Sequence, residues 1–175
     1  MLQIGYYSSP LGKITMAADG GAVCGVWFEG QKYYPELSGY AETDCAALIA
    51  CRRWLELYFA GREPDFLPPL QPRGSEFRQA VWAELLKIPY GETTTYGAIA
   101  AALAPQRGLD SMSAQAVGGA VGHNPISILI PCHRVVGADG SLTGYAGGTA
   151  RKLRLLELEK ADLSGLYVPT KGTAL

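Results

Sequence analysis

The stretch SAQAVGGAVGHNPISILIPCHRVV, residues 113–136, brings together a run of very small residues, an aliphatic run and a cysteine beside a histidine. Ser113 is a favoured residue at a helix N-terminus, and the small residues after it predict a short helix over residues 114–122. Asn124 and the proline after it should end that helix, because the residue before a proline disfavours helical backbone. An asparagine in such a turn commonly bonds nearby backbone, so Asn124 is a candidate to brace the segment that follows.

The aliphatic run ISILI, residues 126–130, predicts a buried segment that leads into Cys132. Pro131 fixes its own φ and disfavours helix before it, so we expect the cysteine in extended chain or a turn, at the floor of a pocket. A thiol beside the imidazole of His133 is typical of nucleophilic catalysis, in which the thiolate attacks. Adjacent side chains usually point apart, so His133 reaches the thiol directly only if the backbone turns sharply. Proton transfer through one water suits this arrangement better.

Glu159 is the candidate to orient His133. It follows Leu155 and Leu156 by four and three residues, so it flanks the apolar face of a helix predicted over residues 150–161, with Thr149 as cap. A carboxylate drawn into that position would stabilise an imidazolium and select one tautomer. The alternative is that Glu159 only borders a solvated helix face.

The first third of the chain reads as strands followed by a helix. Asp-Gly-Gly is a good hairpin turn, and the runs around it are rich in β-branched and aromatic residues. The helix spans residues 45–61, with Thr43 or Asp44 as its cap and Gly61 at its end. The predicted strands cover residues 2–7, 12–19 and 22–29.

Residues 61–74, GREPDFLPPLQPRG, form a stiff proline-rich connector, and we place the domain boundary there. The second half is mostly helical. Its predicted helices are residues 76–88 after Ser75, residues 96–104 after Thr95, and residues 114–122 after Ser113. The last two of these suggest a helix-turn-helix, although the loop between them fits an ordinary αα-hairpin as well. The domains are therefore predicted as 1–72 (α/β), 73–161 (mainly α) and a loose tail, 162–175.

Composition narrows the class of protein. The chain has 175 residues, 48% of them apolar and 18% charged, with a net charge of −1, which argues against coating nucleic acid by bulk charge. The N-terminus has no basic start or apolar core, and the longest aliphatic run is too short to cross a bilayer, so we expect a cytoplasmic protein with no membrane association. Cys24, Cys45 and Cys51 are expected to be small buried hydrophobes. No C-x-x-C spacing signals a metal or redox site.

The segments AVGGAVGHNP, IPCHRVV, GSLTGYAGG and KLRLLELE closely resemble the O6-alkylguanine-DNA alkyltransferases, also called methylated-DNA–protein-cysteine methyltransferases. The resemblance covers about residues 75–160. It implies a small N-terminal α/β domain that is ribonuclease-H-like and a C-terminal helical domain with a winged-helix-like helix-turn-helix. It also implies a DNA repair activity without a cofactor or metal, in a monomer that acts on double-stranded DNA carrying O6-alkylguanine, with O4-alkylthymine as a further candidate substrate.

The resemblance further implies a role for each motif residue. Cys132 would take the alkyl group by in-line displacement, once per molecule. His133 would withdraw the thiol proton through water, Glu159 would polarise His133, and Asn124 would hold the active-site turn. Nothing in the sequence looks built to hydrolyse the resulting thioether, so the alkylated protein is the end product.

DNA contacts are implied in the same way. The family presses the helix at residues 114–122 into the minor groove, where small residues allow close approach, and rotates the target base out of the stack. Tyr96 falls where an aromatic residue helps that rotation. Gln115 stands where relatives commonly have an arginine wedge, and the loop at residues 104–112 is longer than in many relatives, so Arg107 is a candidate for a compensating phosphate contact. The other implied DNA or base contacts are Ala116, Gly118, Gly119, Arg134, Tyr145 and Ala146, the last in place of a serine seen in some members.

Two rival functions remain open on the sequence. A lesion-binding module of the alkyltransferase-like type lacks the cysteine, so Cys132 counts against it. A cysteine hydrolase would need an oxyanion hole and would turn over repeatedly, whereas an alkyltransferase stops after one equivalent.

Overall fold

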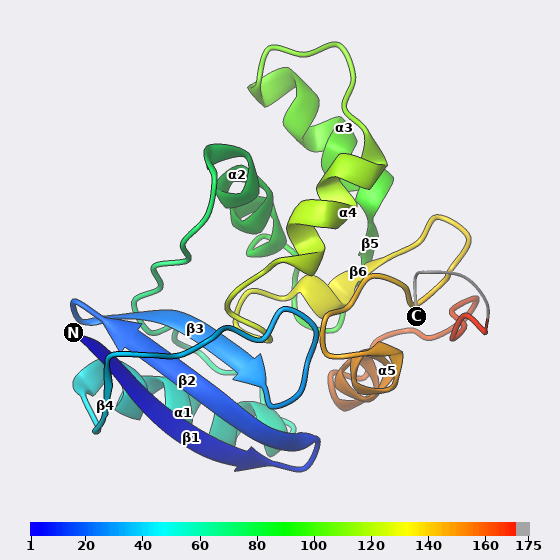
Figure 1. Cartoon of the computed structure of the whole chain (residues 1–175). Coiled ribbons are helices and arrows are strands. Elements are labelled where there is room, and N and C mark those ends of the chain that lie inside the picture. The colour runs from blue at the N-terminus through cyan, green and yellow to red at the C-terminus, as the bar shows by residue number, and fades with distance from the viewer. Residues whose placement is uncertain (171–175) are drawn as a thin grey trace. The chain divides into compact units, whose positions relative to one another are not determined.

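The computed structural model describes residues 1–170 and contains two compact units (Figure 1). The first comprises Met1–Arg73 together with Pro125–Leu129, and the second comprises Gly74–Asn124 and the chain from Ile130 onward. The short segment Pro125–Leu129, which precedes the motif cysteine, therefore packs with the N-terminal unit although it lies far along the chain.

A four-stranded sheet forms the body of the first unit, with strand order β3-β2-β1-β4. The hairpin strands are antiparallel, and the short β4 adds in parallel beside β1. Gly20 and Gly21 make the β2–β3 turn with φ of 57° and 84°, which glycine adopts without a steric penalty. The strands predicted from the sequence are confirmed with small changes of end point: β1 Leu2–Ser9, β2 Gly12–Asp19, β3 Ala22–Phe28 and, not predicted, β4 Tyr40–Glu42.

Helix α1, Ala46–Phe59, packs against this sheet. Its inward face carries Leu48, Cys51, Leu55 and Tyr58, all without solvent exposure. The predicted caps are wrong: the N-cap residue is Cys45, and no side chain caps the helix. The carboxylate of Asp44 instead accepts a hydrogen bond from Arg52, at 3.1 Å.

The second unit is helical, and two parallel strands of two residues each join distant parts of it. The predicted caps Ser75, Thr95 and Ser113 are confirmed, since each side chain accepts a hydrogen bond from a backbone N–H in the first turn. Trp82 donates to the carbonyl of Ala120 at 2.8 Å and so ties α2 to α4. The elements are α2 Glu76–Leu85, β5 Thr94–Thr95, α3 Tyr96–Gln106, α4 Ala114–Gly122, a 3₁₀ turn Cys132–Arg134, β6 Val135–Val136 and α5 Thr149–Leu158.

Two expectations for the C-terminal part are wrong. Thr149 is the first residue of α5 rather than its cap, because Gly148, with φ of 92°, occupies the N-cap position. The chain beyond Leu163 is not loose throughout: the backbone of Tyr167 bonds both Gly140 and Leu142, and its hydroxyl donates to Asp139 at 2.6 Å. Residues 171–175 of the predicted tail lie outside the described residues.

Among residues 1–170, no helix has the length and apolar character needed to cross a bilayer. The same residues contain no cluster of histidine, cysteine and carboxylate side chains that could hold a metal ion.

Candidate active site

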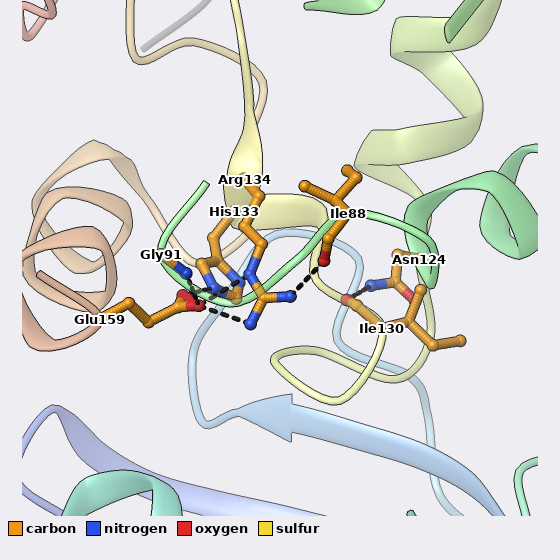
Figure 2. A network of polar contacts seen from close by, with 7 residues as sticks. All are labelled: Ile88, Gly91, Asn124, Ile130, His133, Arg134 and Glu159. Carbon is orange, nitrogen blue, oxygen red and sulfur yellow. Dashed lines mark hydrogen bonds and ion pairs between the residues drawn. The ribbon is translucent and has the colours of Figure 1, made fainter. Parts of the chain in front are cut away.

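Cys132 begins the 3₁₀ turn at the end of the aliphatic run and is 5% exposed. Pro131 before it has φ of −81° and ψ of 62°, and the Cys132 N–H donates to the carbonyl of Ile130 at 2.8 Å. These values define an inverse γ-turn, which agrees with the turn expected from the proline. The same carbonyl accepts a hydrogen bond from Nδ2 of Asn124 at 2.8 Å (Figure 2). Asn124 therefore braces the backbone that presents the cysteine.

The carboxylate of Glu159, directly after α5, is the centre of a buried polar network (Figure 2). Its Oε2 lies 2.5 Å from Nε2 of His133. Its Oε1 accepts from Nε of Arg134 at 2.7 Å and from the N–H of Gly91 at 3.4 Å. Arg134 also donates to the carbonyl of Ile88 at 2.7 Å. Every partner fixes the carboxylate in place, and the carboxylate in turn fixes the imidazole ring.

Burial and charge set the protonation states of this network. Burial raises the pKa of the Cys132 thiol, against a hydrogen bond from Asn124. Burial also lowers the pKa of His133, although Glu159 opposes this effect. For Glu159, burial acts to raise the pKa, but hydrogen bonds and charge interactions with His133 and Arg134 outweigh it and lower the pKa to about 2. Near neutral pH the three groups are therefore a thiol, a neutral imidazole and a carboxylate.

Lys152 on α5 is a functional candidate that the sequence analysis missed. Its side chain is fully buried, and Nζ donates to the carbonyls of Val135 and Thr143, the latter at 2.7 Å. Burial lowers the pKa of Lys152 to about 8, while the neighbouring Cys132 acts to raise it. The ammonium in turn acts to lower the pKa of the Cys132 thiol. Lys152 thus supplies a positive charge beside the sulfur. Its two hydrogen bonds also link the segments that contain Val135 and Thr143.

A signal for Lys152 was present in the sequence. Residues three, four and seven positions apart share one face of a helix, so Lys152 lies above Leu155, Leu156 and Glu159 on the buried face of α5. Lysine is almost never fully buried unless paired, which is why it reads as a surface residue beside Arg151.

The residues predicted to contact the base lie around the loop Thr143–Tyr145. The hydroxyl of Tyr96 donates to the carbonyl of Thr143 at 2.7 Å. Gly144 has φ of 82°, and a Cβ there would lie 2.5 Å from that hydroxyl, so only glycine fits. The ring of Tyr145 lies edge-on to His133, with centroids 6.5 Å apart. Ala146 is half-buried after it.

Helix α4 exposes its small residues on one side. Gln115, Ala116 and Gly119 are exposed, and Gly118 is half-buried beside the ring of Tyr96. The opposite side is buried and consists of Val117, Ala120 and Val121. The exposed side is thus almost free of bulk, as a helix that approaches a narrow groove requires.

Arg134, which the resemblance implies as a DNA contact, lies in the buried polar network. The residue is 8% exposed, its guanidinium is paired with Glu159, and it lies 5.7 Å from the ring centroid of Tyr90. Its position assigns it to the buried network instead of to the surface. Arg107, the other arginine considered, pairs with Glu76 at 3.7 Å and lies over the ring of Phe77.

Two family models match the chain. The ribonuclease-like domain of 6-O-methylguanine DNA methyltransferase matches residues 2–72, and the DNA binding domain of 6-O-methylguanine DNA methyltransferase matches residues 76–161.

Individual relatives agree with these models. The methylated-DNA–protein-cysteine methyltransferase of Mycobacterium bovis is 46% identical over 153 residues, which is 87% of this chain and 89% of the relative. The Haemophilus influenzae protein of the same name is 41% identical over 89% of this chain and 84% of its own length. A crystal structure of Mycobacterium tuberculosis OGT in complex with DNA matches with a TM-score of 0.78 and 42% identity, over 91% of this chain and 92% of that one. With both domains and nearly the whole length matched, the chain belongs to the 6-O-methylguanine DNA methyltransferase family.

Proposed function

We propose that this protein repairs DNA by transferring the alkyl group from O6 of guanine to Sγ of its own Cys132, once per molecule. The observation that carries the proposal is the buried Cys132 thiol next to the His133–Glu159 pair, in a chain of this family. The relatives' name states a transfer from methylated DNA to a protein cysteine, and Cys132 is the cysteine of this chain that has such neighbours.

The protonation states explain why the thiol needs a base. Because burial raises the pKa of Cys132, the thiol keeps its proton near neutral pH, and only the thiolate attacks. Glu159 is ionised and accepts the Nε2 proton of His133, which places the basic lone pair of the ring on Nδ1. His133 then takes the thiol proton through one water, because side chains of adjacent residues usually point apart. Lys152 stabilises the thiolate that forms.

The transfer itself is a displacement at the alkyl carbon. The thiolate Sγ forms a bond to that carbon while the bond from carbon to O6 breaks, and the bonding electrons stay on the guanine. The guanine anion takes up one proton, which balances the proton that His133 removed from the thiol, and is left as the normal base. Hydrolysis of the thioether would have to expel the Cys132 thiolate, which is a poor leaving group. The protein is therefore consumed.

Access to O6 requires the base to leave the duplex. We propose that α4 enters the minor groove with Gln115, Ala116 and Gly119 leading, and that Tyr96 and Tyr145 receive the rotated nucleotide. The exposed small residues of α4 support this role, and a related protein has been crystallised with DNA. The proposed partner is double-stranded DNA carrying O6-alkylguanine, bound by a monomer in the cytoplasm.

Stoichiometry tests the proposal against its rivals. Purified protein is mixed with excess duplex containing O6-methylguanine, and repaired guanine is counted against time. We expect one guanine per protein molecule and then no further reaction, with Cys132→Ala inert and Cys51→Ala, a substitution at another buried cysteine, unaffected. Continued turnover would indicate a hydrolase, and binding without any repaired guanine would indicate a lesion-binding module.

A further inference from the structure

The segment that precedes the active-site cysteine contains a strained turn. Ile128 has φ of 72°, and the N–H of Leu129 donates to the carbonyl of Ser127 at 2.9 Å across it. This is a γ-turn with positive φ at its centre, the rarer and more strained of the two γ-turn forms. A β-branched residue in that region of backbone space is an outlier that persists only when its surroundings impose it.

The residues just before this turn pair with the edge of β3. The N–H of Val26 donates to the carbonyl of Pro125 at 2.9 Å, and the N–H of Ser127 donates to the carbonyl of Val26 at 3.0 Å. These bonds form a parallel bridge between Val26 and Ile126. Ile126 and Ile128 are almost fully buried, at 0% and 1% exposure. Backbone pairing and side-chain burial therefore both hold residues 125–128 in place.

The other end of the segment carries Cys132. The carbonyl of Ile130 accepts hydrogen bonds from both the Asn124 side chain and the Cys132 backbone, each at 2.8 Å. The orientation of that carbonyl depends on the backbone that leads into it, which is the strained turn at Ile128. If the turn relaxed, the carbonyl would rotate and both bonds would be lost.

We propose that Val26 is a positioning residue for the transfer reaction: the edge of β3 holds the γ-turn at Ile128 in its strained form, and the turn sets the place of the Cys132 sulfur. Residues 125–129 thereby act on the chemistry through the chain that leads into Cys132, without contributing a reacting group. The inference rests on the proposed role of Cys132 as alkyl acceptor.

A matched pair of proline variants tests this role. Proline lacks the N–H, so Val26→Pro removes the bond to Pro125, and this N–H is not one that pairs β3 with β2. Val23→Pro is the control, because the N–H of Val23 makes the equivalent bond at 2.8 Å to Pro69, in the connector. Melting temperature and DNA affinity are measured for both variants, so that a general loss of stability is recognised as such.

The expected result has two readouts that move in opposite directions. In Val26→Pro, methyl transfer at saturating duplex DNA slows by about 10- to 100-fold, because a displacement of about 1 Å in a reacting group can cost about 10²-fold. Alkylation of Cys132 by iodoacetamide at neutral pH becomes faster, because a sulfur released from burial has a lower pKa. Val23→Pro leaves both rates unchanged.

Equal transfer rates in the two proline variants would overturn the proposal, as would a loss of transfer with no gain in iodoacetamide reactivity. A wild-type protein that transfers no methyl would refute the proposed function instead.

A second pair of variants probes the turn itself and decides the matter if Val26→Pro does not fold. Ile128→Gly and Ile128→Ala remove nearly the same side chain, but only glycine adopts positive φ freely. We expect Ile128→Gly to melt at a higher temperature and to transfer methyl faster than Ile128→Ala, the reverse of the usual order of these residues. If alanine equals or exceeds glycine, the turn is not strained and the positioning role is wrong.

Discussion

Oε2 of Glu159 lies 2.5 Å from Nε2 of His133, and neither side chain is accessible to solvent. Arg134 occupies the other carboxylate oxygen, so the ion pair and the hydrogen bond share one acid. The acid thereby selects the His133 tautomer whose basic nitrogen is Nδ1.

Removal of this acid should slow the chemistry without affecting DNA binding. Glu159→Gln is expected to reduce the single-turnover rate of methyl transfer by about 10²–10⁴-fold, the span for losing a general-base element. DNA affinity should be unchanged. Glu157→Gln is the matched control, since Glu157 lies two residues earlier, is 46% exposed and pairs only with Arg154 among the ion pairs of residues 1–170. A near wild-type rate for Glu159→Gln would mean that Glu159 has a structural role only.

The same acid should make stability depend on pH in a defined window. The pKa of Glu159 is about 2 in the folded protein and near 4.5 ordinarily, so the unfolded chain binds its proton first as pH falls. Stability from this group is complete above about pH 4.5 and is lost on acidification toward pH 2. The difference corresponds to about 3 kcal/mol. Denaturant titrations across this window should show that loss in wild type and not in Glu159→Gln; parallel curves would contradict it.

Lys152→Met should make the Cys132 thiol harder to deprotonate. The positive charge of Lys152 acts to lower the pKa of Cys132, so its removal is expected to raise that pKa and to slow transfer. The pH dependence of Cys132 alkylation by iodoacetamide measures this directly, and the variant's profile should move to higher pH. The exposed Lys160, changed to Met, serves as the control for loss of a charge. Identical profiles for wild type and Lys152→Met would mean that the lysine has only a structural role.

Gln115→Arg tests the orientation of α4 on DNA. Gln115 is exposed near the start of the helix, and an arginine there would add a phosphate contact. We expect tighter binding and a steeper salt dependence, by about 0.9 in the slope of log K against log salt concentration. Gln79→Arg adds the same charge at an exposed position of α2 and should change neither quantity. If the two variants behave alike, α4 is not the helix that enters the groove.

The sequence predicted most of what depends on local pattern. The strands β1–β3 and the starts of the helices capped by Ser75, Thr95 and Ser113 follow from short-range rules and are confirmed. Two helix ends are wrong: α2 ends at Leu85 instead of residue 88, and α3 continues to Gln106 instead of ending at residue 104. The strands β5 and β6 were not predicted, because two-residue strands that pair Thr94 with Val135 depend on tertiary contact alone.

At the site, the meeting of His133 with Glu159 was predicted, but its surroundings were not. The burial of Arg134 and Lys152 reverses the usual behaviour of charged residues, so both read as surface groups. The positive φ of Ile128 has no signal in a β-branched residue, whose intrinsic preference is the opposite.

Transfer to Cys132 is tested by intact-protein and peptide mass spectrometry after reaction with duplex DNA that contains one O6-methylguanine. The protein should gain the mass of one methyl group in place of a hydrogen, and the modified peptide should be the one that contains Cys132. A methyl group on Cys24, Cys45 or Cys51, or an unmodified protein beside repaired DNA, would contradict it.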